Sequence, residues 1–241
     1  MIATVNGPAA GAGLALVPGA DDRLLDAALG KAGEIIAHGP SRSFPEGDPF
    51  RAGAEPGAPV HVHVGAGARE AVPPAGGAVC VLIELGLECL GVHTGERASA
   101  EGDRRVGFAR WQLGDSEPSK LVELVVQPDT EPDAVEAARA VFTGAGLSVA
   151  VCRDFAGRIL DRLLRPYFND ALRALDHRLA TAADLDKTVR LGLGYPEGPI
   201  ALLERVGLAR HHDVARHLFK AYGTPGFAPA RRAVVAAARR T

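Results

Sequence analysis

Residues 147–177 read LSVAVCRDFAGRILDRLLRPYFNDALRALDH, and the apolar pattern changes within this stretch from that of a strand to that of a helix. This change decides the fold. The run Leu147–Cys152 is short and mostly apolar, as in a β-strand, whereas Ile159–His177 places apolar residues at helical spacings on one broad face. The change predicts a boundary near Asp154, with one domain at residues 1–152 and a second at residues 153–241.

Upstream of this boundary, short β-like runs alternate with joints rich in Gly and Pro. Two helical patterns, Asp21–His38 and Glu131–Gly144, interrupt them. Strands interspersed with helices predict an α/β fold with a mostly parallel sheet. The stretch Gly39–Pro59 is rich in Pro, Gly and charge, so we expect a long surface loop. The predicted strands are Ile2–Val5, Leu14–Val17, Val60–Val64, Val79–Leu85, Leu90–His93, Val106–Trp111, Leu121–Val126 and Leu147–Cys152.

Downstream of the boundary, the pattern is helical throughout. The apolar face of Ile159–His177 is wide enough to be buried on more than one side, which favours a homodimer through the C-terminal helices. Thr181 and Asp184 have the spacing of a capping box at the start of the next helix. The further helices are predicted at Thr181–Leu191, at Ile200–Val206 with Pro199 in the first turn, at His211–Ala221 and at Pro229–Arg240.

Composition and charge exclude several classes of function. The 241 residues carry a formal net charge of -2, but residues 153–241 hold 16 of the 27 Lys plus Arg and only 9 of the 29 Asp plus Glu. This asymmetry favours an anionic ligand or an acidic neighbour for the second part. No basic run with interleaved aromatics is present, so we expect no nucleic-acid partner. No segment has 18 uninterrupted apolar residues, so we expect no membrane span.

The cysteines and the N-terminus suggest a compartment. Cys80, Cys89 and Cys152 form no CxxC pair, and their odd number argues against a disulfide scaffold. Met1–Val5 lacks the basic segment and long apolar run of a signal peptide. We therefore expect free thiols and a cytoplasmic protein.

Three motifs in the second part occur in a fixed order: GRILDRLLRPYFN at Gly157–Asn169, ADLD at Ala183–Asp186 and LGLGYPEGPIALLERVGL at Leu191–Leu208. They are similar to GFIVNRLLxPYLNEA, EDID and GLGYPMGPFELLDxxGLD of the 3-hydroxyacyl-CoA dehydrogenase family, the NAD-dependent enzymes of fatty-acid β-oxidation. The resemblance implies a shortened, Rossmann-like NAD-binding domain followed by an all-helical, 6-phosphogluconate-dehydrogenase-like domain. It also implies an acyl-CoA thioester as substrate.

The first part resembles the same family only in fragments. Lys120–Val125 (KLVELV) is similar to KLVEVV, Leu90–Gly95 lies where the family has LASNTS, and Val81–Glu84 lies where it has VIEA. Arg105–Phe108 falls at the RxxGLHFFNP segment, and Asn6–Val17 can be laid on GxGxMGxGIALV. The resemblance implies an NAD site that includes Gly7, Gly11, Gly13 and Glu84.

The catalytic constellation is only partly kept. In the family, a His of the HFFNP segment takes the substrate hydroxyl proton and a Glu of KLVEV orients it. Here Glu123 matches that Glu, whereas Trp111 is nearest to the His position. Thr94 remains of the NTS motif, and Asp161 replaces the Asn of IVNRLL. The resemblance therefore implies Glu123, Thr94 and Asp161 as catalytic candidates, with impaired or altered oxidation.

The cofactor loop is altered as well. Asn6 and Pro8 replace the first two glycines of the fingerprint, and Pro8 removes an N–H donor where a pyrophosphate would need one. A non-catalytic acyl-CoA-binding or scaffold protein is the alternative function, and an enzyme with its base elsewhere is a third.

Four other features have two interpretations each. Val5–Leu14 resembles the VNGPAAGGGL segment of enoyl-CoA hydratases, or it is a simple turn. His61 and His63 share a strand face, as two metal ligands could, but without a third ligand a half-exposed face is the simpler interpretation, and no metal site is predicted. His211 and His212 are expected to be a solvated pair. A cluster of arginines could bind CoA phosphates or pair with acids of the first domain: Arg153, Arg158, Arg162 and Arg165.

Overall fold

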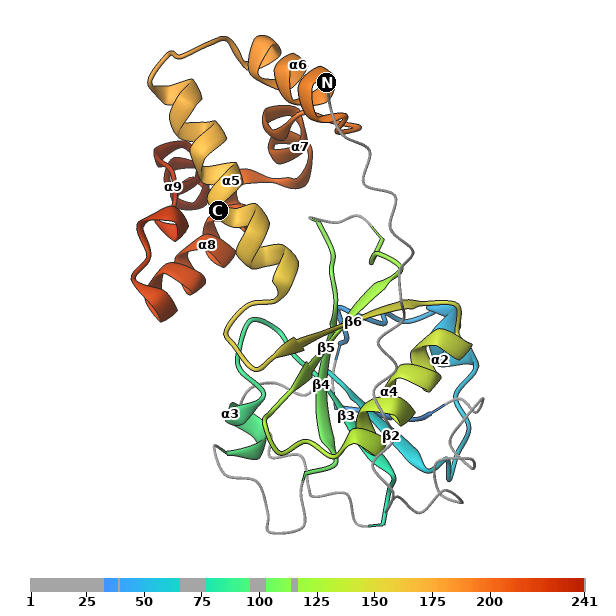
Figure 1. Cartoon of the computed structure of the whole chain (residues 1–241). Helices are drawn as coiled ribbons and strands as arrows, with labels where there is room; N and C mark the ends of the chain where they lie inside the picture. Colours follow the sequence, from blue (N-terminus) through green and yellow to red (C-terminus); the bar gives the residue numbers. More distant parts are fainter. Residues whose placement is uncertain (1–32, 39, 66–76, 96–102, 114–116, 241) are drawn as a thin grey trace, which may run out of the picture.

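The computed structural model describes residues 33–38, 40–65, 77–95, 103–113 and 117–240. An α/β domain built on one sheet is followed by a helical domain, and Figure 1 shows the two stacked end to end. The last strand ends at Arg153 and the first long helix begins at Ile159, so the change from strands to helices occurs where the sequence indicates. The division at residue 152 itself stays a prediction.

The described strands form one sheet in the order β1-β2-β3-β4-β5-β6. Every neighbouring pair is parallel except β4 and β5, which are antiparallel. This arrangement confirms the predicted α/β class with a mostly parallel sheet. The strands are β1 (Glu34–Ala37), β2 (Val60–Val64), β3 (Cys80–Glu84), β4 (Arg105–Arg110), β5 (Leu121–Val126) and β6 (Ser148–Arg153).

Helix α4 (Pro132–Gly144) covers one face of the sheet, as Figure 1 shows, and its buried side chains pack on the strands. Phe142 of α4 meets Phe108 of β4 with ring centroids 5.3 Å apart. Phe44 and Phe50 complete this aromatic core, their stacked rings 4.1 Å apart. Aromatics are scarce in the sequence, so four of them in one cluster supply a large share of the apolar burial here.

The prediction of a surface loop at Gly39–Pro59 is therefore wrong in part. The segment contains the short helix α2 (Pro49–Ala52), whose N-terminus is capped by the Asp48 carboxylate accepting from the Phe50 N–H at 2.9 Å. Its polar residues lie at the surface, whereas Phe44 and Phe50 enter the core. Composition averaged over the stretch hid these two anchors.

Two further elements differ from the sequence prediction. The end of the predicted helix Asp21–His38 is strand β1, because Glu34–Ala37 pairs in parallel with β2. The predicted strand Leu90–His93 is instead the short helix α3 (Gly91–Thr94). The Asp154 carboxylate, far away in sequence, accepts from the Leu90 and Gly91 N–H groups at 2.6 and 2.8 Å and fixes this turn. The predicted strands Ile2–Val5 and Leu14–Val17 lie outside the described residues.

The helices predicted for the second part are confirmed. Phe168 and Leu172 of the first long helix pack on Ile200 and Leu203, which gives this domain its own core. Thr181 caps its helix by accepting from the Asp184 N–H at 3.2 Å. The helices are α5 (Ile159–Asp176), α6 (Ala182–Leu193), α7 (Pro199–Val206), α8 (Leu208–Tyr222) and α9 (Arg231–Ala238), with the 3₁₀ turn η1 (Pro225–Phe227).

Two hydrogen bonds hold the segment before α5, and the first of them joins the helical domain to the sheet domain. The Gly157 N–H donates to the Leu87 carbonyl at 2.8 Å, and the Tyr222 hydroxyl donates to the Ala156 carbonyl at 2.6 Å. These contacts hold the N-terminus of α5 beside the carboxyl edge of β3. Within the described ranges, none of the helices is long and apolar enough to cross a membrane.

Candidate functional site

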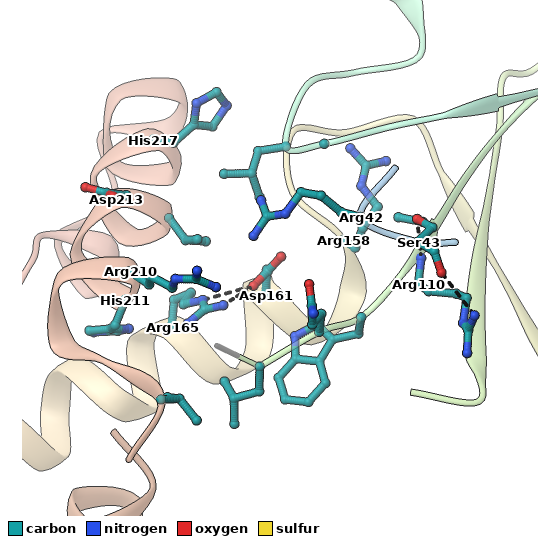
Figure 2. Close-up of a pocket in the computed structure, with 18 of the residues that line it drawn as sticks. Arg42, Ser43, Arg110, Arg158, Asp161, Arg165, Arg210, His211, Asp213 and His217 are labelled. Atoms are coloured by element: carbon teal, nitrogen blue, oxygen red, sulfur yellow. Dashed lines mark hydrogen bonds and ion pairs between the residues drawn. The ribbon is translucent and has the colours of Figure 1, made fainter. Parts of the chain in front are cut away.

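A pocket of about 400 Å³ lies between the two domains. Its sheet side consists of residues that follow β3 and end β4, together with one side chain of β5; its helical side comes from α5 and α8. Figure 2 shows Arg210, His211, Asp213 and His217 on α8, facing Arg42, Ser43 and Arg110 across the pocket. The carboxyl edge of parallel strands is where α/β proteins commonly bind ligands, and the volume suits a small organic group.

The pocket is rich in positive charge. Among the described residues that line it, the acids are Glu123, Asp161 and Asp213, and the arginines outnumber them: Arg42, Arg110, Arg158, Arg165, Arg210 and Arg240. Three of these arginines have a carboxylate partner at 2.7 Å, in the pairs Arg110–Asp48, Arg165–Asp161 and Arg240–Asp213. Both parts of the chain contribute to this positive charge, since Arg42 and Arg110 come from the first part and the other four arginines from the second.

Glu123 lies on β5 at the base of the pocket, with only 1% of its surface exposed. Its Oε1 accepts from the Leu160 N–H at 3.1 Å, whereas its Oε2 is buried without a hydrogen-bond partner among the described residues. Burial raises the pKa of Glu123, against the opposing effects of the Leu160 N–H and of Arg158. A carboxyl group with one free oxygen and an elevated pKa can hold or exchange a proton.

Across the ladder from Glu123 stands Ala109 of β4, its register partner in the antiparallel pair. Both residues line the pocket. Trp111 lies beyond the end of β4 and also lines the pocket, with its indole Nε1 buried and unpartnered among the described residues. The side chain that meets Glu123 from the neighbouring strand is therefore a methyl group.

Asp161 reaches the pocket from the first turn of α5 and is ion-paired. Arg165, one turn further along, donates from Nε at 2.9 Å and from Nη2 at 2.7 Å to the same Asp161 oxygen. Both side chains are largely buried. The structure thus brings two of the three catalytic candidates, Glu123 and Asp161, into one pocket.

Arg158, the residue before α5, is buried with 3% of its surface exposed. Its Nη2 donates to the Glu88 carbonyl, but its Nε and Nη1 are buried and have no hydrogen-bond partner among the described residues. The predicted cluster of four arginines does not form. Arg162 stacks on Phe155 and Tyr222 at 5.1 and 4.8 Å from the ring centroids, and Arg153 is exposed at the end of β6, so only Arg158 and Arg165 line the pocket.

Thr94 and Glu84 are not among the residues that line the pocket. Thr94 ends α3, and its hydroxyl donates to Gln127 Oε1 at 2.9 Å. Glu84 ends β3, and its carboxylate accepts from backbone N–H groups at both oxygens: Arg42 and Ser43 at 3.0 and 2.7 Å on Oε1, and Gly65 at 2.7 Å on Oε2. The other residues assigned to the cofactor, Gly7, Gly11 and Gly13, lie outside the described residues.

His211 is a pocket residue that the sequence interpretation missed. It is buried rather than solvated: its Nε2 lies 2.9 Å from Asn169 Oδ1, and its Nδ1 is buried without a partner. Burial, helped by the charge of Arg165, lowers the pKa of His211 to about 3. The helical spacing of His211, Ala215 and Leu218, all buried on α8, was the signal that could have placed it.

His61 and His63 do not gather a metal site. His63 is buried and stacks on His38 with ring centroids 5.1 Å apart, the His38 Nε2 and His63 Nδ1 atoms lying 2.8 Å from each other. His61 faces Glu34 at 3.9 Å. Within the described ranges, no group of three or more His, Cys, Asp or Glu side chains could hold a metal ion.

The sequence of the helical domain, which forms one side of the pocket, matches a known family model. The family description that matches is "3-hydroxyacyl-CoA dehydrogenase, C-terminal domain", over residues 157–240. The match covers 84 of the 241 residues, and it lies in the helical part of the chain. The sequence prediction of this family is thereby confirmed for the helical domain.

Relatives with this domain are found in animals and bacteria. The human mitochondrial hydroxyacyl-coenzyme A dehydrogenase is 38% identical over 89 residues, which are 37% of this chain and 28% of the relative. A 3-hydroxybutyryl-CoA dehydrogenase of Mycobacterium tuberculosis is 36% identical over 110 residues, which are 45% of this chain and 38% of the relative. The matches thus span less than two fifths of these relatives' own length.

Solved structures extend the likeness to the fold of both domains. An (S)-3-hydroxybutyryl-CoA dehydrogenase from Ralstonia eutropha superposes with a TM-score of 0.62 at 21% identity, covering 75% of this chain and 65% of that one. A 3-hydroxybutyryl-CoA dehydrogenase from Escherichia coli K12 gives the same TM-score of 0.62 at 23% identity, covering 74% of this chain and 39% of that one. The arrangement of a Rossmann-like domain before a helical domain is therefore confirmed.

The family segment RxxGLHFFNP can also be aligned with β4 in a second way. With Arg104 and Gly107 laid on the Arg and Gly of RxxGLHFFNP, the His position is Ala109, not Trp111. This is the residue that pairs with Glu123 across the sheet. On this alignment, a methyl group faces the buried carboxyl group of Glu123.

Proposed function

We propose that this 3-hydroxyacyl-CoA dehydrogenase homologue binds an acyl-CoA thioester in the pocket between its domains, and that its oxidation of 3-hydroxyacyl-CoA is impaired or altered. The observation that carries the proposal is the pairing of Ala109 with Glu123 at the base of that pocket. An alanine methyl group can neither accept nor relay the proton of a substrate hydroxyl.

The remaining groups of the pocket are poorly matched to that proton transfer. Nδ1 of His211 has a free lone pair, but with a pKa of about 3 it is a weak base near neutral pH. Asp161 is engaged by Arg165. Glu123 has a free Oε2 and a raised pKa, so it is the group best able to hold a proton beside a bound thioester.

NAD, implied by the resemblance, does not fit the residues that surround its expected site. Glu84 already accepts three backbone hydrogen bonds, two at Oε1 and one at Oε2, so most of its acceptor capacity is used within the protein. Asn6 and Pro8 replace glycines of the phosphate loop, and Pro8 has no N–H to offer. Altered cofactor use is therefore part of the proposal, and no step is assigned to NAD.

Two titrations and one rate separate this proposal from its alternatives. We expect acetoacetyl-CoA to bind the purified protein, NADH to bind weakly or not at all, and 3-hydroxybutyryl-CoA to be oxidised far more slowly than by an active relative such as the human enzyme. Binding of thioester without turnover would favour the non-catalytic acyl-CoA-binding protein. Binding of neither ligand would favour a scaffold, and a rate typical of the relatives would contradict the proposal.

We also propose a homodimer formed through the helical domain. Leucines on and around α6 are strongly exposed, with Leu179 at 75% and Leu191 at 77%, and no residue of α6 is buried. Exposed large apolar side chains such as these are typical of an interface when they form a patch. Light scattering should give about twice the 25.0 kDa chain mass, and Leu191→Asp should shift the protein toward the monomer. A wild-type species of 25.0 kDa would contradict the dimer.

A cytoplasmic location completes the proposal. Cys80, Cys89 and Cys152 are free thiols in the structure, as suits a reducing compartment. Fractionation of the source cells, with the protein detected by antibody, tests it.

A further inference from the structure

We propose that Arg158 binds a carboxylate at the far end of the acyl chain, so that the preferred ligands are acyl-CoA thioesters whose acyl group is itself an acid. The inference rests on the proposed binding of a thioester in this pocket and specifies the class of acyl group. It follows from the burial of Arg158, from its free donors and from the way the other charges of the pocket are paired.

Arg158 is a buried cation with unused donors. It is 3% exposed, and only its Nη2 has an acceptor, the Glu88 carbonyl. The Nε and Nη1 atoms are buried, have no hydrogen-bond partner in the described part of the chain, and belong to a residue that lines the pocket. A buried guanidinium without an anion is costly to maintain, which a ligand carboxylate would relieve by accepting charge-assisted hydrogen bonds.

Arg158 differs from three other arginines of the pocket because no carboxylate among the described residues is paired with it. Arg110, Arg165 and Arg240 each have a carboxylate at 2.7 Å. No carboxylate of the described residues is within ion-pair distance of Arg158. Glu123 is near enough to feel its charge, but Glu123 directs Oε1 to the Leu160 N–H and burial disfavours its ionised form. Within the described part of the chain no anion meets Arg158, so a carboxylate of the ligand can take this place.

The depth of Arg158 points to the acyl chain rather than to the phosphates of CoA. It lines the same pocket as Glu123 and Ala109, and all three are buried. Arg42 and Arg210 also line the pocket, but both are exposed. Phosphates at the rim would meet exposed arginines, whereas a group that reaches the buried guanidinium has to enter the pocket with the acyl chain. In the family motif this position is Phe, so an apolar contact has been replaced by a charge.

The experiment compares two thioesters that differ in one group. Isothermal titration of the full chain with adipyl-CoA and hexanoyl-CoA, whose acyl chains have equal carbon number, measures the value of the terminal carboxylate. We expect adipyl-CoA to bind at least about tenfold more tightly, as a buried charge-assisted hydrogen bond would give. Equal affinities, or tighter binding of hexanoyl-CoA, would overturn the inference while leaving thioester binding intact. Binding of neither would instead count against the proposed function.

Variants assign the preference to Arg158. In Arg158→Gln the ratio of the two affinities should fall close to one, and Arg158→Lys should retain part of it because the charge remains. Arg42→Gln, at an exposed arginine of the same pocket, is the matched control and should leave the ratio unchanged. The ratio is measured within one protein sample, so partial unfolding of a variant affects both ligands alike, and circular dichroism monitors the fold.

Titration with free CoA tests whether Arg158 binds the CoA phosphates instead of the acyl carboxylate. If Arg158 holds the acyl carboxylate, Arg158→Gln should leave the affinity for free CoA within about twofold of wild type. A loss for CoA as large as the loss for adipyl-CoA would mean that Arg158 binds the CoA phosphates, and this would overturn the assignment to the acyl chain. An unchanged ratio in Arg158→Gln would overturn it as well.

Discussion

The helical domain and the sheet domain differ in how their residues match the family motifs. In the helical domain, motif residues of the family still perform structural work: Asp186 of ADLD accepts from the Ile200 and Ala201 N–H groups at 2.8 and 3.0 Å and caps α7. In the sheet domain the layers are kept, but Ala109 now faces Glu123. The helical architecture therefore rests on hydrogen bonds that several residues share, whereas a proton transfer would depend on a single side chain.

The structural role of the motif residues in the helical domain can be tested by their contribution to stability. Asn169, from the motif PYFN, is fully buried; its Oδ1 accepts from the Ala230 N–H at 3.2 Å and contacts His211 Nε2 at 2.9 Å, and its Nδ2 donates to the Gly226 carbonyl at 2.9 Å. Asn169→Leu should lower the free energy of unfolding by about 3 kcal/mol, because several buried groups lose their partner. Urea denaturation measures this loss.

The neighbouring Asp170 supplies the control. Its carboxylate is mostly exposed and pairs with Arg173 at 2.8 Å. Asp170→Asn should change the unfolding free energy by less than about 0.5 kcal/mol. Similar losses for the two variants would mean that the buried network has no special role.

A second change tests the cap on α7. Asp186→Ala removes the acceptor of two N–H groups at the start of this helix, and we expect a loss of about 1–2 kcal/mol in the free energy of unfolding. Glu204→Ala, at an exposed position of the same helix, should be close to neutral. A thermal melt that moves equally for both variants would contradict a capping role.

The stability of the helical domain should depend on pH through His211, which is buried in this domain. Its folded pKa of about 3 lies below the ordinary value of 6.5, so the unfolded chain binds more protons between these values. The stabilisation is fully present above pH 6.5 and decreases as the pH falls toward 3. The slope due to this residue is at most about 1.4 kcal/mol per pH unit.

The variant His211→Gln isolates this contribution. Its unfolding free energy, followed by urea titration from pH 7 to pH 4, should depend less on pH than that of the wild type. His217→Gln, on the same helix, is the control and should keep the wild-type slope. Parallel curves for wild type and His211→Gln would exclude His211 as the source.

The smallest effect is expected at the contact between Arg162 and the rings of Phe155 and Tyr222. Arg162→Gln should cost about 0.5–1 kcal/mol in the free energy of unfolding, the usual value of an exposed cation–π contact. A loss well above this range, measured by urea denaturation, would show that Arg162 contributes more to the packing of the helical domain than this contact suggests.

The sequence predicted the elements whose apolar pattern is internal to the element. Helices α5 to α9 follow from spacing and caps, and strands β2 to β6 follow from short apolar runs. The pattern failed at Leu90–His93, where Asp154 provides the cap from a distant segment. It failed at Phe44 and Phe50 because a loop composition does not reveal which aromatic side chains turn inward.

The candidate site was predictable to a smaller extent. Glu123 and Asp161 were found through the motifs and do share the pocket. Glu84 was taken for a cofactor residue, but its partners are backbone N–H groups of loops that no sequence pattern connects to it. The unused donors of Arg158 and the facing position of Ala109 depend on burial and strand register, which only the folded chain provides.

The central claim is that oxidation is impaired because Ala109 stands where an imidazole would face Glu123. The most direct test is the oxidation rate of 3-hydroxybutyryl-CoA by wild type and by Ala109→His, both measured at an NAD concentration high enough to offset weak binding, with the double variant Ala109→His/Glu123→Gln as control. The account predicts that the single variant is at least about 100-fold faster than wild type, as a restored general base would give, and that the double variant loses the gain. A wild-type rate that already equals that of active relatives, and that Ala109→His does not raise, would contradict it.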